Sequence, residues 1–189
     1  MYSHEKSSFV SLTCFGFRCA GYTRGMADPS TDEHARLAAR VGDAARSTGR
    51  SVATAESLTG GQIACTLGAA PGSSEWYFGS IVAYVSAVKH RLLRVPDVPV
   101  ISEISARTMA VTTAELLGAD VVVAVTGAAG PGRQEGHNPG TVWLGIVAGD
   151  AIHTEYRDFE GTTDEIIAQT VTRALELIVL FVEAFHDLS

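Results

Sequence analysis

Cysteine is scarce in this sequence, and the few histidines follow no metal-binding pattern. The three cysteines, Cys14, Cys19 and Cys65, are an odd number without the spacing of metal ligands. None of the six histidines belongs to a His-x-x-x-His pair, so a zinc site is not expected. We therefore expect a reduced, cytoplasmic protein without a metal site. We also expect no cofactor.

Long apolar runs and an excess of basic residues are also missing. No stretch approaches the roughly 20 apolar residues that cross a bilayer, so no membrane association is expected. The chain carries 14 Lys and Arg against 21 Asp and Glu, a formal net charge of −7, which argues against a nucleic-acid partner. A small-molecule substrate stays open, because a basic pocket can exist in an acidic protein.

The length of 189 residues and the 46% apolar content fit one globular domain. Residues 1–25 show no periodic pattern, and we expect them to form a disordered extension; an extra strand packed on the domain is the alternative. Residues 26–189 are expected to form the domain itself.

From Ser30 onward, helical and strand patterns alternate along the chain. Capping boxes at Ser30-x-x-Glu33 and Thr162-x-x-Glu165 and an N-cap at Ser102 mark helix starts. Helices are predicted over 30–49, 59–70, 86–95, 102–118 and 162–182, and strands over 51–55, 79–85, 119–127, 141–149 and 151–159, the last two as a hairpin. This order predicts an α/β fold: a three-layer sandwich with a mixed, mostly parallel sheet and helices on both faces.

Ligands of open α/β sheets gather at the carboxyl ends of strands, and three such ends carry polar or glycine-rich residues here. The first is Glu56-Ser57-Leu58-Thr59-Gly60-Gly61. The free N–H groups of a helix start beside Ser57 would suit an oxyanion, and the two glycines would let a ligand approach closely. The alternative is that Ser57 or Thr59 only caps the helix.

The second strand end holds Tyr84 and Lys89. A lysine that acts as a general base must be neutral, whereas its ordinary pKa is about 10.4, so it needs burial or nearby cations. The alternatives are a solvated lysine in the charged run 89–94 and a tyrosine that belongs to the core.

The third strand end opens a glycine-rich loop over 128–140. Thr126, Gly127 and the loop residues that follow could present N–H groups to a phosphate or an amide oxygen. The loop contains neither a Walker A motif nor a dinucleotide-binding turn. A flexible connection is the alternative, although loops of this length are usually functional.

Taken together, the segments 55–61, 71–74, 84–89 and 126–131 resemble the CinA C-terminal domain family, whose members include nicotinamide mononucleotide (NMN) deamidases. The resemblance implies a homo-oligomeric amidohydrolase that converts NMN to nicotinate mononucleotide and ammonia. It assigns catalysis to Ser57, Tyr84 and Lys89. It assigns binding of the nucleotide substrate to Glu56, Thr59, Gly60, Gly61, Thr126, Gly127, Ala128, Ala129, Gly130 and Pro131.

The chain departs from that family where basic residues are usual. Thr163 and Ile167 stand at two positions that carry arginine in the family, so an inactive module that binds nucleotides or a partner protein is the alternative function. A second alternative places the nucleophile at Ser86, because Ser86-Ala-Val-Lys89 matches the S-x-x-K pattern.

Overall fold

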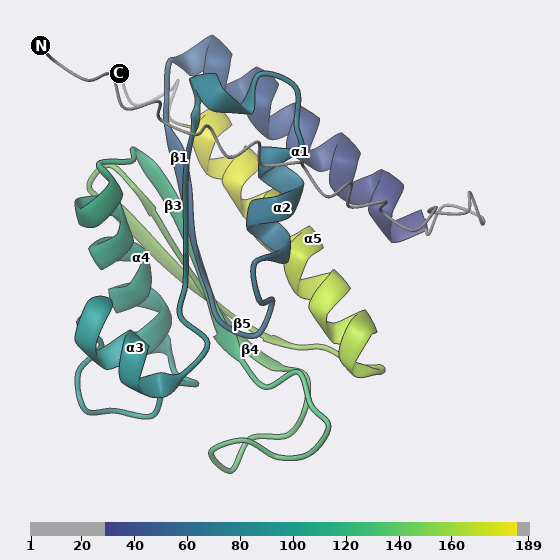
Figure 1. Ribbon diagram of the computed structural model, residues 1–189, viewed down its shortest axis with the longest axis vertical. Helices are drawn as coiled ribbons and strands as arrows, with labels where there is room; N and C mark the ends of the chain where they lie inside the picture. Colours follow the sequence, from purple (N-terminus) through teal and green to yellow (C-terminus); the bar gives the residue numbers. More distant parts are fainter. Residues whose placement is uncertain (1–28, 185–189) are drawn as a thin grey trace, which may run out of the picture.

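A five-stranded sheet separates two layers of helices in the computed structural model, which describes residues 29–184 (Figure 1). The spatial order is β2-β1-β3-β4-β5. β1 pairs in parallel with β2 and β3, whereas β4 is antiparallel to both β3 and β5. This confirms the predicted mixed sheet, in which β4 alone runs against the others. The strands are β1 (Val52–Glu56), β2 (Tyr77–Val82), β3 (Val121–Gly127), β4 (Thr141–Ala148) and β5 (Ala151–Asp158).

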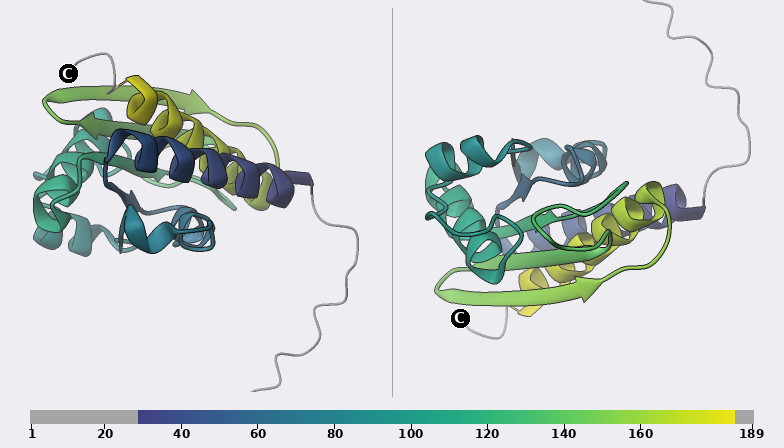
Figure 2. Two further views of the ribbon diagram at one scale, coloured as in Figure 1. Left: turned by 90° about the horizontal axis from the view of Figure 1, so that it is seen from above. Right: turned by 90° about the horizontal axis from the view of Figure 1, so that it is seen from below.

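Helices cover both faces of the sheet, as predicted (Figures 1 and 2). One layer holds α1 (Pro29–Thr48), α2 (Gln62–Gly68) and α5 (Thr163–Ala184), and the other holds α3 (Ser86–Leu92) and α4 (Glu103–Leu117). A short 3-10 helix spans Ser73–Glu75 before β2. The larger core lies between the first layer and the sheet, because the apolar side of α5 packs on alternate residues of β3 such as Val121, Val123 and Val125.

Two of the three predicted helix caps are present. Ser102 Oγ accepts a hydrogen bond from Ser105 N at 3.2 Å at the start of α4. Before α5, Glu165 Oε2 accepts one from Thr162 N at 2.7 Å, the reciprocal contact of a capping box. The third predicted cap, at Ser30, lies in the first turn of α1 next to the start of the described residues, and it stays a prediction.

The predicted bounds of the second strand, 79–85, were wrong. β2 spans Tyr77–Val82, and its register pairs Tyr77 with Val52 and Val82 with Glu56. The partner strand β1 ends at Glu56, whose carbonyl accepts one last hydrogen bond from Ala83 N at 2.8 Å, and Tyr84 and Val85 have no β1 residue left to pair with. The length of β1, rather than intrinsic propensity, thus fixes the end of β2.

Close backbone packing holds α4 against β4. A Cβ atom at Gly145 would lie 2.5 Å from the carbonyl oxygen of Ala106 in α4, which is closer than real Cβ contacts. Glycine at this position therefore lets the helix approach the sheet.

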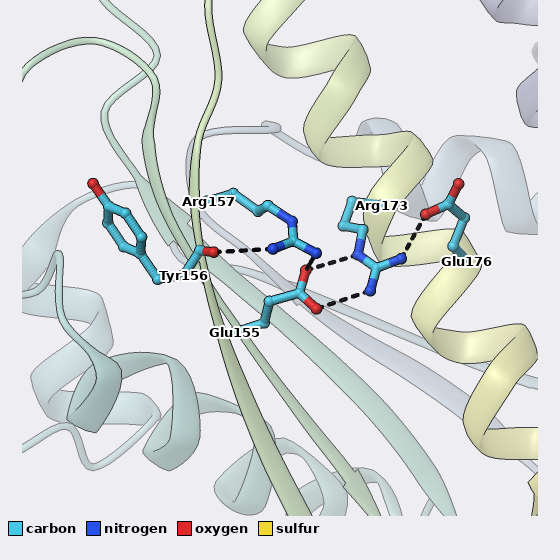
Figure 3. Close-up of polar contacts among 5 residues, drawn as sticks. All are labelled: Glu155, Tyr156, Arg157, Arg173 and Glu176. Atoms are coloured by element: carbon cyan, nitrogen blue, oxygen red, sulfur yellow. Dashed lines mark hydrogen bonds and ion pairs between the residues drawn. The ribbon is translucent and has the colours of Figure 1, made fainter.

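Charged residues connect the edge strand β5 to α5 (Figure 3). The Arg173 guanidinium donates to both carboxylate oxygens of Glu155, at 2.7 and 2.8 Å, and to Glu176 at 2.7 Å. Arg157 lies 2.8 Å from the same Glu155 carboxylate. The helix that covers the sheet is thus tied to the outermost strand by a network rather than by one isolated pair.

Residues 1–25, expected to form an extension, lie outside the described residues. Within 29–184, none of the helices combines the length and the apolarity that a bilayer span requires. The same part of the chain brings together no group of three or more histidine, cysteine or acidic side chains that could hold a metal ion.

Candidate active site

The carboxyl ends of β1, β2 and β3 open into one cleft of about 350 Å³. They lie at the lower end of the sheet in Figure 1, where the loop after β3 also projects. Seven of the predicted site residues line the cleft: Ser57, Tyr84, Lys89, Thr126, Gly127, Ala129 and Gly130. Segments that are far apart in sequence are thereby brought to one place, as the topology of parallel strands requires.

Lys89 is one of only two lysines in the sequence, and its residue is only 2% exposed. Its Nζ donates a hydrogen bond to the backbone carbonyl of Tyr84 at 3.1 Å. Burial lowers the pKa of Lys89 below its ordinary value, while the Glu135 carboxylate acts in the opposite direction. The solvated-lysine alternative is therefore wrong. The amine sits in a setting that favours its neutral form more than water does.

Ser57 follows directly after β1 and is 7% exposed. Among the described residues, its hydroxyl has no hydrogen-bond partner, so it neither caps α2 nor forms a hydrogen bond with Lys89 Nζ. The backbone N–H groups of Ser57 and of the next cleft residue, Leu58, likewise find no acceptor within 29–184. The hydroxyl and these two donors remain available to a ligand.

The start of α2, by contrast, is occupied by Glu56. The fully buried carboxylate accepts hydrogen bonds from three backbone N–H groups, those of Gly61, Ile63 and Ala64, at 2.8 to 3.1 Å. It also accepts one from Thr59 Oγ1 at 2.7 Å. The expectation of free helix-start donors beside Ser57 was wrong, because a carboxylate already neutralises that helix terminus.

Six predicted binding residues do not line the cleft: Glu56, Thr59, Gly60, Gly61, Ala128 and Pro131. Gly60 and Gly61 adopt φ angles of 59° and 100°, so the turn itself requires glycine at these positions. Ala128 is fully buried against Val100 and Ile101. Glu56 and Thr59 are also buried, whereas Gly60 and Pro131 are exposed outside the cleft lining.

Tyr84 is not a core residue, since it is 71% exposed at the cleft. Its backbone carbonyl holds Lys89, whereas its ring faces solvent and the space that a ligand would fill. Thr126, at the carboxyl end of β3, is fully buried and donates from Oγ1 to the Val100 carbonyl at 2.7 Å.

The structure adds cleft residues that sequence reasoning missed: Val100, Ile101, Gln134 and Glu135. Glu135 carried a usable signal, because it is the single acidic residue of the glycine-rich loop 128–140. Thr163 and Ile167, singled out earlier as neutral replacements, line the cleft from the first turns of α5. Ser86 lines it as well, so both candidate serines reach the same space.

Comparison with known proteins shows similarity along most of the chain. Residues 34–182 match the model of the CinA C-terminal domain family. "Nicotinamide-nucleotide amidohydrolase PncC" of Pseudomonas putida is 39% identical over 147 residues, which cover 74% of this chain and 91% of that protein. A "CinA-like protein" of Synechocystis is 41% identical over 116 residues, 58% of this chain and 28% of that protein. The chain thus spans nearly all of one relative and under a third of the other.

Solved structures agree with these matches. A CinA superfamily protein of Escherichia coli has a TM-score of 0.75 at 30% identity, covering 82% of this chain and 94% of that one. A competence damage-inducible protein A of Klebsiella pneumoniae has a TM-score of 0.75 at 31% identity, covering 78% of this chain and 95% of that one. This chain belongs to the CinA C-terminal domain family.

Proposed function

We propose that this protein is a serine amidohydrolase that hydrolyses the carboxamide of NMN or of a closely similar pyridine substrate. The observation that carries the proposal is the shared cleft, in which Ser57 after β1 meets Tyr84 and a buried Lys89 after β2. The printed name of the Pseudomonas putida relative, a nicotinamide-nucleotide amidohydrolase, supports the same chemistry.

In the proposed first step, neutral Lys89 takes the hydroxyl proton of Ser57 as Oγ attacks the amide carbon. The negative charge that forms on the amide oxygen needs hydrogen-bond donors, and the free N–H groups of Ser57 and Leu58 are the candidates. A neutral Lys89 amine has a lone pair that can accept this proton and two N–H groups, one of which can keep donating to the Tyr84 carbonyl. Hydrogen bonds of this kind commonly tighten only when the substrate is bound.

In the proposed second step, the C–N bond breaks and the Lys89 proton leaves with the nitrogen as ammonia. The product remains as an ester on Ser57 Oγ. A water molecule, deprotonated by Lys89, then attacks the ester carbon, and Ser57 Oγ recovers its proton as the carboxylic acid departs. Every proton that moves can be carried by the one lysine, so the scheme requires no further acid or base.

The test is ammonia release from NMN by the purified protein. Ser57→Ala and Lys89→Ala should each abolish it, while Ser73→Ala, at a half-buried serine that does not line the cleft, should leave it intact. Full activity in both cleft variants would remove the mechanism. Calorimetric binding of NMN without any turnover would instead support the alternative of an inactive binding module.

A further inference from the structure

Formal charge is sparse in the cleft. Among its lining residues, only Lys89 and Glu135 carry charged groups, and Tyr84 is the one other titratable side chain. The start of α5 contributes Thr163 and Ile167, both neutral. When Lys89 is neutral, as its proposed role as a base requires, the carboxylate of Glu135 is the one formal charge that residues 29–184 present to the ligand.

Glu135 is fixed in this position by its backbone surroundings. Its Oε2 accepts a hydrogen bond from Ile101 N at 3.2 Å, which joins the loop 128–140 to the segment before α4. Its φ of 48° is left-handed, which is uncommon for a residue other than glycine. The neighbouring Gln134 and His137 close the loop with two mutual backbone hydrogen bonds, of 2.9 and 3.1 Å. The loop therefore holds the carboxylate at the rim.

The surroundings offer little to a phosphate. The first turn of α5 carries Asp164 and Glu165, and the Glu165 carboxylate already accepts hydrogen bonds from the Thr162 N–H and hydroxyl. The nearby Arg133 does not line the cleft, and its guanidinium donates to the Gly136 carbonyl within its own loop. Within the part of the chain that the structure describes, a phosphate dianion would thus meet a carboxylate without the cations that usually bind it.

Building on the amidohydrolase function above, we propose that the cleft selects substrates by charge. The preferred substrate is an N-substituted pyridinium carboxamide that carries no phosphate, with Glu135 as the residue that faces the cationic ring. The ring and the carboxylate attract each other, and the amide lies toward Ser57. A phosphate on the substituent reverses the net charge of the ligand, and the same carboxylate then repels it.

Nicotinamide riboside and NMN test this directly, because they share the ring and the amide and differ only in the phosphate. Binding is measured by calorimetry on the Ser57→Ala variant, so that the result does not depend on turnover. We expect the riboside to bind at least as tightly as NMN. Binding of NMN about tenfold tighter or more, as a charge-assisted phosphate contact would give, overturns the inference, and so does binding of neither ligand.

Nicotinamide riboside and NMN also distinguish the amidohydrolase proposal from the proposal of selection by charge. If the riboside binds better but the unmodified protein releases ammonia from neither compound, the hydrolase proposal fails and the charge preference stands. If ammonia is released efficiently from NMN and NMN binds better, the hydrolase proposal stands and the charge preference fails.

Glu135→Gln tests the assigned residue, since glutamine keeps an oxygen that can accept from Ile101 N. It should weaken riboside binding by about two- to fivefold, as loss of one partly screened charge pair does, and should narrow the difference in affinity between riboside and NMN. Asp164→Asn removes a carboxylate of α5 outside the cleft. It should change neither the affinity for the riboside nor the difference in affinity between riboside and NMN. An unchanged riboside-to-NMN ratio in Glu135→Gln overturns the role of Glu135.

Discussion

Lys89 is a buried amine within a cleft, and burial disfavours its charged form. Because its pKa is lowered, the neutral amine becomes abundant at a lower pH than for a lysine in water. We expect kcat/KM to rise with pH through a single pKa below the ordinary 10.5. Initial rates of ammonia release across the neutral and alkaline range measure this. A flat profile would show that the lysine does not act as a base.

A second prediction concerns Lys89→Arg. Arginine can still donate to the Tyr84 carbonyl, but it keeps its proton at all accessible pH values. We expect this variant to lose amidohydrolase activity by at least about a hundredfold, the lower end of what general-base catalysis contributes. Circular dichroism should show a folded protein. An active Lys89→Arg enzyme would contradict the proposed proton transfer.

Glu56 supplies a third prediction at this scale. Its carboxylate accepts three backbone N–H groups and the Thr59 hydroxyl in a fully buried place. Glutamine would replace one acceptor oxygen with a donor and leave buried N–H groups unpaired, so Glu56→Gln should lower the free energy of unfolding by about 2–3 kcal/mol. Urea denaturation measures this, and a loss below about 0.5 kcal/mol would contradict the anchoring role.

At the scale of helices and strands, the pairing of β5 with α5 through Glu155 and Arg173 predicts a pH-dependent stability. Hydrogen bonds from Arg173 are the largest cause that lowers the pKa of Glu155 below its ordinary 4.5. The contribution is therefore complete above pH 4.5 and is lost as the pH falls through the lower pKa of the folded state. Glu155→Gln should cost about 1 kcal/mol at neutral pH and progressively less in acid.

The matched control is Glu183→Gln. Glu183 pairs with Arg40, but the two side chains are 45% and 60% exposed, against 12% for Glu155 and 26% for Arg173. Exposed pairs contribute little, so this change should cost less than about 0.5 kcal/mol. Equal losses in both variants would show that the network in Figure 3 adds nothing beyond an ordinary surface pair.

The contact of α4 with β4 predicts the effect of a single methyl group. Gly145→Ala places a Cβ 2.5 Å from the Ala106 carbonyl oxygen, so helix and sheet must separate, at a cost of about 1–3 kcal/mol. Gly68→Ala is the control, because no atom lies within 4 Å of its added Cβ. In thermal denaturation, the Tm of the control should equal or slightly exceed that of the parent protein. A Gly145→Ala variant with an equal or higher Tm would contradict the close approach of α4 and β4.

Most elements could be predicted from sequence because their signals are local. The Val run of β3 and the caps at Ser102 and Thr162 fixed their elements within one or two residues. The end of β2 could not be predicted, since it depends on where its partner β1 stops. The role of Glu56 was missed for a similar reason. A carboxylate at a strand end suggests chemistry, and only the fold shows that it faces a helix start.

At the scale of the whole molecule, the fold explains why Ser57, Tyr84 and Lys89 share a cleft: parallel strands end at one side of the sheet. The same geometry brings in Val100 and Glu135, which no motif indicated, because contacts between loops depend on packing rather than on sequence spacing. The predicted homo-oligomer stays a prediction. Sedimentation equilibrium tests it, and a monomer at all concentrations would contradict it.

The central claim is that Ser57 is the nucleophile of this cleft, and a serine-directed fluorophosphonate followed by peptide mass spectrometry tests it most directly. The account predicts a single covalent adduct on Ser57, absent from Ser57→Ala and strongly reduced in Lys89→Met. Ser86, which lines the same cleft, should stay unmodified. An adduct on Ser86 that persists in Ser57→Ala, in a protein that releases ammonia, would contradict the account.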